Sequence, residues 1–414
     1  MKNFLVHNEK TTQEMCEAIG INKVEDLFKQ IPQSVRMPEL DLPEGLSEME
    51  TQRKVKNLAK SNKSDFISFL GGGIYNKFVP ACINQVASRF EFNTAYTPYQ
   101  PEISQGTLQV MYEFQTMICR LTGMDISNAT VYDAGTACAE AILMACRISK
   151  KYKVCVLNSL NPEYKRVIET YTNSQGIEVD WVDEIPQATK DYAGVLVQTP
   201  NYYGEIIQPK EVECLSIICC DPSSLAILKT PAEMGADIAV GDIQTLGIPM
   251  NFGGPSAGFI ACREKLMRQL PGRLAGRTVD KDGKQAFCLT IQTREQHIKR
   301  EKATSNICSN QALIGLCATL YLSVMGNKGF RQASYLSTKN AHILADKLKE
   351  KGYKILNTNF FNEFVLEVPN ADDFLARLEN NNILGGIKLD DKKILVATTE
   401  MISDEDIDLY IKSI

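Results

Sequence analysis

One loop contains most of the residues whose side chains could take part in chemistry. It reads Tyr96-Thr-Pro-Tyr99-Gln100-Pro-Glu102, and Ser104 follows as the expected N-cap of a helix over residues 104–122. Prolines restrict the backbone, so we expect a stiff loop that projects hydroxyl, amide and carboxyl groups into a site. Such groups can bind a small carboxylate or position a reactive molecule. The alternative is an ordinary buried elbow. The candidate residues are Tyr96, Tyr99, Gln100, Glu102 and Ser104.

A second candidate is the small-residue turn that contains Gly135 and Thr136, at the start of an Ala-rich helix expected over residues 136–150. The first N–H groups of a helix have no partner within it and can bind an anion. The turn is therefore a possible phosphate-binding position. The alternative is that Gly135 is an ordinary turn glycine.

The composition indicates an enzyme-sized soluble protein. The chain has 414 residues, 44% of them apolar and 23% charged, which suggests two or three domains. A net charge of -5 argues against nucleic-acid binding. There is no apolar run of about 18 residues, and the N-terminus becomes charged too early for a signal peptide. We therefore expect a cytoplasmic protein without a membrane segment.

The cysteines and histidines do not predict a metal site. Thirteen cysteines are scattered without a Cys-x-x-Cys pair, which favours buried, reduced thiols. The three histidines, His7, His297 and His342, are far apart in the sequence. We expect each of them to be a surface or structural residue.

Residues 1–65 are expected to form an arm that wraps the body of the protein or a partner. Two capping-box patterns, Thr11-x-x-Glu14 and Ser47-x-x-Glu50, predict helices over 12–19 and 48–61. Prolines punctuate the stretch between them. The alternative is a small helical domain, but about 60 residues with so many prolines would bury little core.

Residues 66–305 are expected to form a large α/β domain, and residues 306–414 two linking helices and a small α+β domain. Short β-branched segments alternate with helices, which is typical of a mostly parallel sheet covered on both faces. Strands are expected over 154–157, 177–181, 194–197, 215–218, 238–240 and 258–261, and the linking helices over 309–325 and 328–351. Functional loops should follow the carboxyl ends of the strands. We interpret Gly71-Gly72-Gly73 as a packing turn.

This order of elements is the layout of pyridoxal-phosphate enzymes of the aspartate aminotransferase type, fold type I. Such an enzyme needs an anion-binding position for the phosphate, an acid near the pyridine nitrogen and a lysine that bonds the cofactor aldehyde. Gly135 and Thr136 could supply the first, and Asp221, after an apolar strand, the second. The lysine is expected after the next strand, where the residue is Gln244. An amide cannot condense with an aldehyde.

A self-sufficient pyridoxal-phosphate lyase would have to use another lysine. The nearest in sequence are Lys229 and Lys265, and both lie in predicted connections rather than at the carboxyl end of a strand. The scaffold is therefore interpreted as a cofactor-binding half that has lost the attachment residue.

Five motifs resemble the N-terminal-half chains, called subunit 1, of the glycine cleavage system P-protein family. They span most of residues 65–310, and the second is the most specific. The motifs are Phe69-Leu-Gly-Gly-Gly-Ile-Tyr75, Tyr96-Thr-Pro-Tyr-Gln-Pro-Glu-Ile-Ser-Gln-Gly106, Tyr132-Asp-Ala-Gly-Thr-Ala137-Cys-Ala-Glu-Ala141, Gln198-Thr-Pro-Asn-Tyr-Tyr-Gly204 and Leu246-Gly-Ile-Pro-Met-Asn-Phe-Gly-Gly-Pro255. The arm and the C-terminal domain match only in general character.

The resemblance implies a division of labour between two chains. Subunit 2 would carry the lysine and bind pyridoxal phosphate, in a heterotetramer with two copies of each chain. The assembly would decarboxylate glycine and transfer the aminomethyl group to the lipoyl arm of the H-protein. Tyr96, Tyr99, Gln100, Glu102 and Ser104 would face the partner's cofactor or glycine, while Gly135, Thr136, Asp221 and Gln244 would be vestigial. The alternative is a purely structural scaffold.

Overall fold

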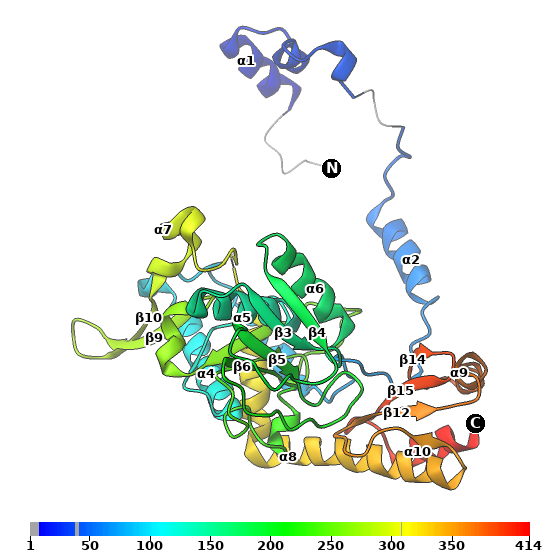
Figure 1. Ribbon diagram of the computed structural model, residues 1–414. Helices are drawn as coiled ribbons and strands as arrows, with labels where there is room; N and C mark the ends of the chain where they lie inside the picture. Colours follow the sequence, from blue (N-terminus) through cyan, green and yellow to red (C-terminus); the bar gives the residue numbers. More distant parts are fainter. Residues whose placement is uncertain (1–7, 38–40, 308) are drawn as a thin grey trace. The chain divides into compact units, whose positions relative to one another are not determined.

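The structure is a computed structural model that describes residues 8–37, 41–307 and 309–414. By the contacts within it, the chain forms two compact units, Met1–Ser64 and Asp65–Ile414 (Figure 1). His7 lies outside the described residues, as does part of the proline-containing stretch expected in the arm.

The first unit contains two α-helices. Helix α1 (Glu9–Ile19) begins earlier than predicted, because the side chain of Asn8 accepts a hydrogen bond from the backbone N–H of Thr11 and caps the helix. The predicted start at the Thr11 capping box was therefore wrong. Helix α2 (Glu48–Ala59) begins at Ser47, and the predicted capping box between Ser47 and Glu50 is present.

The first unit has almost no core of its own. Among its described residues only Cys16 is buried, whereas Val35, Met37 and Leu42 are 70%, 77% and 71% exposed. Two short 3-10 helices (Val24–Phe28 and Gln33–Val35) connect α1 to the stretch before α2. These helices cannot be held by burial of their own apolar side chains.

A seven-stranded sheet forms the centre of the second unit. Its order is β2-β8-β7-β6-β5-β3-β4; the pairs from β4 to β7 are parallel, and β8 is antiparallel to both neighbours. The predicted, mostly parallel sheet is thus confirmed. The strands are β2 (Ile126–Ser127), β3 (Lys153–Leu157), β4 (Glu178–Val182), β5 (Gly194–Gln198), β6 (Leu215–Cys219), β7 (Ile238–Asp242) and β8 (Gly258–Cys262).

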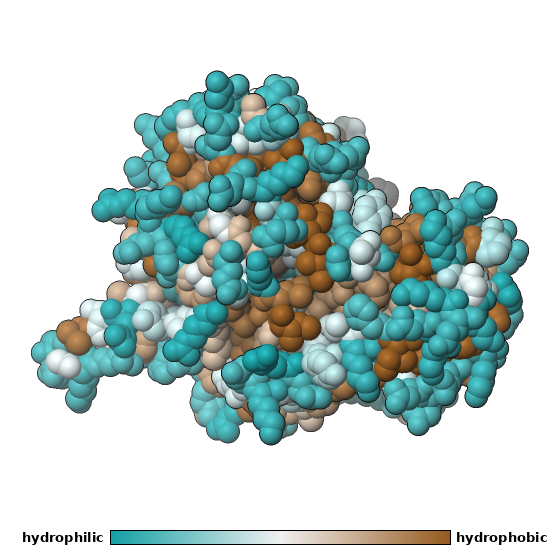
Figure 2. Space-filling model, turned by 60° about the horizontal axis from the view of Figure 1, so that its bottom comes forward, coloured by the Kyte–Doolittle hydropathy of each residue, from teal (hydrophilic) through white to brown (hydrophobic). Residues whose placement is uncertain are grey.

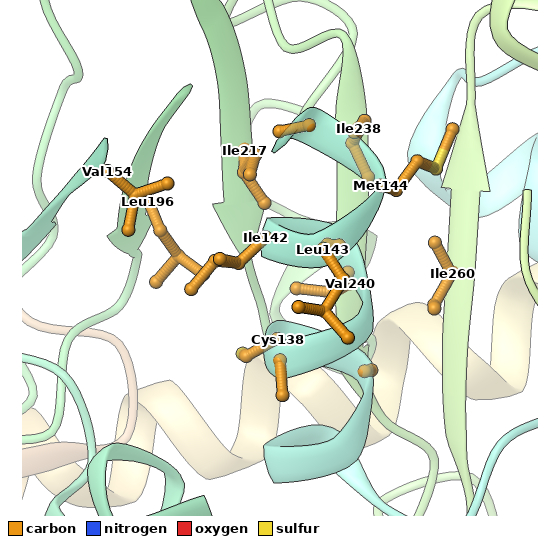
Figure 3. Packing of buried hydrophobic residues seen from close by; sticks show 14 of the residues in the cluster. Cys138, Ile142, Leu143, Met144, Val154, Leu196, Ile217, Ile238, Val240 and Ile260 are labelled. Atoms are coloured by element: carbon orange, nitrogen blue, oxygen red, sulfur yellow. The ribbon is translucent and has the colours of Figure 1, made fainter. Parts of the chain in front are cut away.

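Both faces of the sheet are buried because alternate strand residues point to opposite sides. In β6, Ile217 packs in the cluster that contains α5 (Ala134–Ser149), while Ile218 packs with residues of α4 (Gln105–Thr122) and α8 (Ala312–Glu350). Figure 3 shows labelled side chains of α5 lying among those of the strands. Helix α6 (Pro162–Asn173) packs beside α5, and the short α3 (Ala81–Ala87) contacts α8.

A β-hairpin follows the last strand of the central sheet along the chain. Strands β9 (Leu274–Val279) and β10 (Gln285–Thr290) pair antiparallel around a turn in which Gly283 has a φ of 76°. The dipeptide Asp282-Gly283 is a hairpin signal that would have identified it. Side chains of the hairpin pack on α4.

Helix α8 connects the sheet to the C-terminal part of the unit (Figure 1). Gly326 interrupts it with φ 58° and ψ -179°, which agrees with the two helices predicted on either side of residue 326. The C-terminal part contains the sheet β11-β12-β15-β14 and the two-residue pair of β1 and β13. Its elements are β1 (Ile67–Ser68), β11 (Lys354–Ile355), β12 (Glu363–Glu367), α9 (Ala371–Glu379), β13 (Ile383–Leu384), β14 (Ile387–Asp390), β15 (Lys393–Ala397) and α10 (Asp404–Lys412).

One face of the molecule is shown in space-filling form. Figure 2 shows polar and charged side chains over much of one face, with apolar groups visible between them. None of the helices within the described ranges has the length and hydropathy that a membrane span requires.

A buried ion pair joins the start of the large domain to the C-terminal part. Lys77 Nζ lies 3.1 Å from Glu400 Oε2, and both side chains are almost inaccessible. Ser337 on α8 accepts from Lys77 and donates to Glu400. Loss of one charge from such a pair leaves the other buried without compensation.

We expect Glu400→Gln to lower the free energy of unfolding by about 3–5 kcal/mol. Asp408→Asn, which breaks the exposed pair with Lys347, is the matched control and should cost at most about 1 kcal/mol. Urea unfolding followed by circular dichroism measures both. Equal, small losses would show that the Lys77 pair does not hold the two parts together.

Candidate functional site

A cleft lies at the carboxyl ends of β5, β6 and β7, where the C-terminal part of the unit meets the sheet. The space free within it is about 40 Å³, which is room for only a few water molecules. The lining residues are Gly73, Tyr75, Tyr164, Gln198, Pro200, Asn201, Gly204, Cys219, Cys220, Asp221, Asp242, Gln244, Thr245, Phe361, Asn362 and Glu363. Two of the sequence-predicted positions, Asp221 and Gln244, are thus brought together.

Gln244 lies two residues beyond the end of β7 and is almost fully buried. Its amide nitrogen donates to the carbonyl oxygens of Tyr75 and Ile248, at 2.9 and 2.8 Å. Its amide oxygen accepts from the Tyr75 backbone N–H at 3.0 Å. All three hydrogen bonds are to backbone groups, so the side chain is a structural bridge in this position.

Asp221 lies two residues beyond the end of β6. Thr245 Oγ1 donates to one of its carboxylate oxygens at 2.5 Å. The Ser223 backbone N–H and hydroxyl donate to Asp221 at 2.9 and 2.6 Å. The acid expected near a pyridine nitrogen therefore has its oxygens satisfied by the chain itself.

Two carboxylates occupy the start of α5, where the sequence predicted an anion-binding position. The Thr136 backbone N–H donates to Asp133 at 2.7 Å, and the Ala134 N–H donates to Asp242 at 3.2 Å. Gly135 packs closely on α6, because a Cβ atom there would lie 3.0 Å from the side chain of Val167. Two of the first N–H groups of the helix are thus already paired with anionic side chains.

Asp242 connects this helix start to the turn that carries Gln244. It accepts hydrogen bonds from the Gln244 backbone N–H at 2.9 Å and from the Ser256 hydroxyl. Burial raises the pKa of Asp242 to about 6, and the hydrogen bonds that it accepts act in the opposite direction.

Glu363 of β12 closes the cleft from the C-terminal side. Its carboxylate accepts from the Gly72 N–H at 2.6 Å and from the Tyr75 hydroxyl at 3.0 Å. A Cβ atom on Gly71 would lie 2.2 Å from Glu363 Oε1, so this position requires glycine. The three-glycine turn is therefore a packing turn, as predicted. Burial raises the pKa of Glu363 to about 7.

The residues of this cleft do not fit pyridoxal phosphate. The expected lysine position is a glutamine with all its hydrogen bonds made, carboxylates occupy the place of the phosphate, and the free space is too small for the cofactor. Lys229 and Lys265 are exposed and do not line the cleft, and Lys265 pairs with Asp237. No cofactor chemistry follows from these residues within this chain.

The tyrosine loop lies elsewhere on the surface, because none of its five predicted residues lines the cleft. Tyr96 is 82% exposed and Tyr99 47% exposed, and Gln100 and Glu102 are also exposed. The alternative, an ordinary buried elbow, is therefore wrong for the two tyrosines, and all four side chains are accessible from the surface.

Ser104 differs from the prediction. It occupies the N-cap position of α4, but its side chain makes no capping hydrogen bond, and its backbone has φ -125° and ψ 22°. The hydroxyl is buried and has no hydrogen-bond partner among the described residues. The predicted side-chain cap was therefore wrong, because this backbone conformation does not direct the hydroxyl to the helix N–H groups.

Sequence reasoning assigned no role to three residues in or beside the cleft: Tyr75, Asp133 and Glu363. Asp133 had a usable signal, since an Asp three residues before Thr136 is an N-cap pattern. No sequence signal identified Glu363, because it lies in an ordinary strand pattern and is 288 positions from Tyr75.

The sheet order, the covering helices and the cleft between the sheet and the C-terminal part of the unit define a fold type I scaffold. A glutamate decarboxylase of Lactobacillus brevis shares this fold with a TM-score of 0.65 at 11% identity over 94% of this chain and 97% of that one. An alanine–glyoxylate aminotransferase of Nostoc sp. shares it with a TM-score of 0.56 at 15% identity, covering 92% and 97%.

The chain belongs to the glycine cleavage system P-protein family, whose model matches residues 2–414. A probable glycine dehydrogenase (decarboxylating) subunit 1 of Geobacillus thermodenitrificans is 42% identical over 100% of this chain and 99% of its own. The corresponding protein of Carboxydothermus hydrogenoformans is 44% identical, covering 98% and 97%. A solved structure of glycine decarboxylase, the P-protein, in an inhibitor-bound form is 37% identical with a TM-score of 0.91, covering 99% of both chains.

The raised pKa of Glu363 predicts a pH-dependent stability. In the unfolded chain the pKa is near 4.5, so the contribution of this group is fully present below that pH and is lost as the pH rises through about 7. Glu363→Gln remains neutral, so the variant should gain on the order of 3 kcal/mol relative to the wild type between pH 4.5 and 7.5. Denaturant unfolding across this range measures the difference.

Glu379→Gln removes an exposed carboxylate of α9 and serves as the control for the Glu363 variant. Its stability should follow that of the wild type at every pH. Parallel curves for Glu363→Gln and the wild type would contradict a raised pKa of Glu363.

Proposed function

We propose that this chain is the subunit 1 of a glycine-decarboxylating enzyme whose cofactor, pyridoxal phosphate, is bound by a separate subunit 2. The single observation that carries the proposal is the filled cleft, in which Gln244 bridges backbone groups where a lysine would be needed. The names of the relatives support the substrate glycine and the existence of a second subunit.

In this proposal the two subunits form a heterotetramer with two copies of each. Together they remove CO2 from glycine and transfer the aminomethyl group to the lipoyl arm of the H-protein, in the cytoplasm. The tyrosine loop of this chain completes the site of the partner. The exposure of Tyr96, Tyr99, Gln100 and Glu102 supports this, since polar side chains outside the chain's own cleft are available to bind or orient a ligand held by another subunit.

We expect the full-length chain, incubated alone with excess pyridoxal phosphate, to retain no cofactor after gel filtration. Gln244→Lys should also retain none, because Asp133 and Asp242 still occupy the phosphate position. Absorbance spectra, and mass spectrometry after borohydride reduction, measure uptake. Subunit 2 under the same conditions is the positive control.

A stoichiometric pyridoxyl group on Lys229 or Lys265 would favour the self-sufficient lyase instead. Neither lysine lines the cleft, and that is why we place this reading second.

We expect Tyr96→Phe to lower the turnover of the reconstituted two-subunit enzyme about tenfold, the loss of roughly one hydrogen bond of 1.4 kcal/mol. Tyr152→Phe is the matched control, because Tyr152 is also well exposed but lies before β3, outside the loop. The glycine–bicarbonate carboxyl-exchange reaction measures turnover. Unchanged rates for both Tyr96→Phe and Gln100→Ala would instead support a purely structural scaffold.

A further inference from the structure

The tyrosine loop makes only local hydrogen bonds. Within the part of the chain that the structure describes, residues 96–103 form hydrogen bonds only with one another and with the two residues that follow. Burial holds little of this segment, because Pro98 is its one buried residue. The ring of Tyr99 adds contacts with His297 and with the guanidinium of Arg273. The position of the loop therefore depends on few interactions.

Gln105, the first residue of α4, connects the loop to the hairpin of β9 and β10. Its amide nitrogen donates to the carbonyl oxygen of Pro101, within the loop, at 2.6 Å and to that of Phe287, on β10, at 2.8 Å. Its amide oxygen accepts from the backbone N–H of Phe287 at 2.8 Å. An amide nitrogen carries two hydrogens, so both donors and the acceptor are used. Neither an apolar side chain nor a carboxylate could make these three bonds.

The pairing pattern of the hairpin explains why an amide fits at this position. In an antiparallel pair, every second residue directs its N–H and C=O groups away from the other strand. Phe287 lies opposite Arg277 in the register, and its outward groups meet the amide of Gln105. The side chain of Gln105 therefore takes the place of a further strand at the edge of β10, and it holds the loop at that edge.

The chain contains a matched case on the other strand of the hairpin. Gln115, further along α4, donates to the carbonyl oxygen of Ala275 at 3.0 Å and accepts from its N–H at 2.9 Å. Phe287 and Leu289 are also buried in the cluster between the hairpin and α4. Both glutamines thus attach the hairpin to α4, but only Gln105 also bonds to the loop. Loss of Gln105 would leave the hairpin attached through Gln115 and the apolar side chains.

We propose that Gln105 is a positioning residue, whose amide fixes the tyrosine loop against β10 and thereby sets the positions of Tyr96 and Tyr99. This inference rests on the function proposed above, in which the loop completes the site of the partner subunit. Gln105 acts without touching the substrate, because its three hydrogen bonds are all made within the chain. A loop released from β10 would spend a smaller fraction of its time in the productive arrangement.

Gln105→Met tests the positioning in the full chain by itself. Methionine has a similar length but makes none of the three hydrogen bonds, and Gln115→Met is the matched control. Chymotrypsin cleavage after Tyr96 or Tyr99, identified by mass spectrometry, measures the local opening of the loop. We expect this cleavage to be about tenfold faster in Gln105→Met, because the bonds that hold the loop are lost. In Gln115→Met it should proceed at the wild-type rate.

The reconstituted two-subunit enzyme gives a second readout, again by the glycine–bicarbonate exchange reaction. We expect Gln105→Met to lower kcat about tenfold and to leave the KM for glycine within about twofold, because only molecules with the loop in place turn over. Gln115→Met should keep the wild-type kcat. A merely structural role of Gln105 would lower the midpoint of thermal unfolding in both variants and leave kcat unchanged in both.

The outcomes separate this proposal from the proposed function. Wild-type cleavage of the loop in Gln105→Met would overturn the proposal, as would an equally faster cleavage in Gln115→Met. An unchanged kcat in Gln105→Met, when Tyr96→Phe does lower turnover, would also overturn it and would leave the proposed function intact. If neither variant changes turnover while Gln105→Met is cleaved faster, Gln105 does position the loop, and the function proposed for the loop is wrong.

Discussion

The buried amide of Gln244 fixes the arrangement on which the cleft depends. Its three hydrogen bonds join the turn after β7 to the backbone of Tyr75 and Ile248. The backbone N–H of the same residue donates to Asp242, which in turn holds the first N–H group of α5. These bonds form one continuous network. The same network therefore satisfies the polar groups of Gln244 and the backbone N–H group at the start of α5.

Carboxylates of the chain itself accept hydrogen bonds from backbone N–H groups around the cleft. Asp133 and Asp242 pair with the N–H groups at the start of α5, and Glu363 pairs with the glycine turn. Burial of an acid is unfavourable, and the raised pKa values of Asp242 and Glu363 reflect this cost. The hydrogen bonds from several donors offset part of it. The cleft is therefore a packed polar junction, and its hydrogen bonds join two parts of the unit.

The sheet was predictable because short β-branched segments with intervening helices leave few other arrangements. The place of Gln244 was predictable for the same reason, since the residues after consecutive strands meet at one edge. Glu363 and Tyr75 were not, because their contact depends on how the C-terminal part packs on the sheet. Ser104 shows the limit of a local pattern: the residue takes the N-cap position, but the backbone conformation removes the expected hydrogen bond.

The first unit, Met1–Ser64, has a thermodynamic consequence beyond its own structure. Its described residues bury only one side chain, while large apolar side chains such as Val35, Met37 and Leu42 remain exposed. Ordering of such a segment costs conformational entropy that its own burial does not offset. If an apolar surface outside the unit covered these side chains, the association would carry a large negative change in heat capacity.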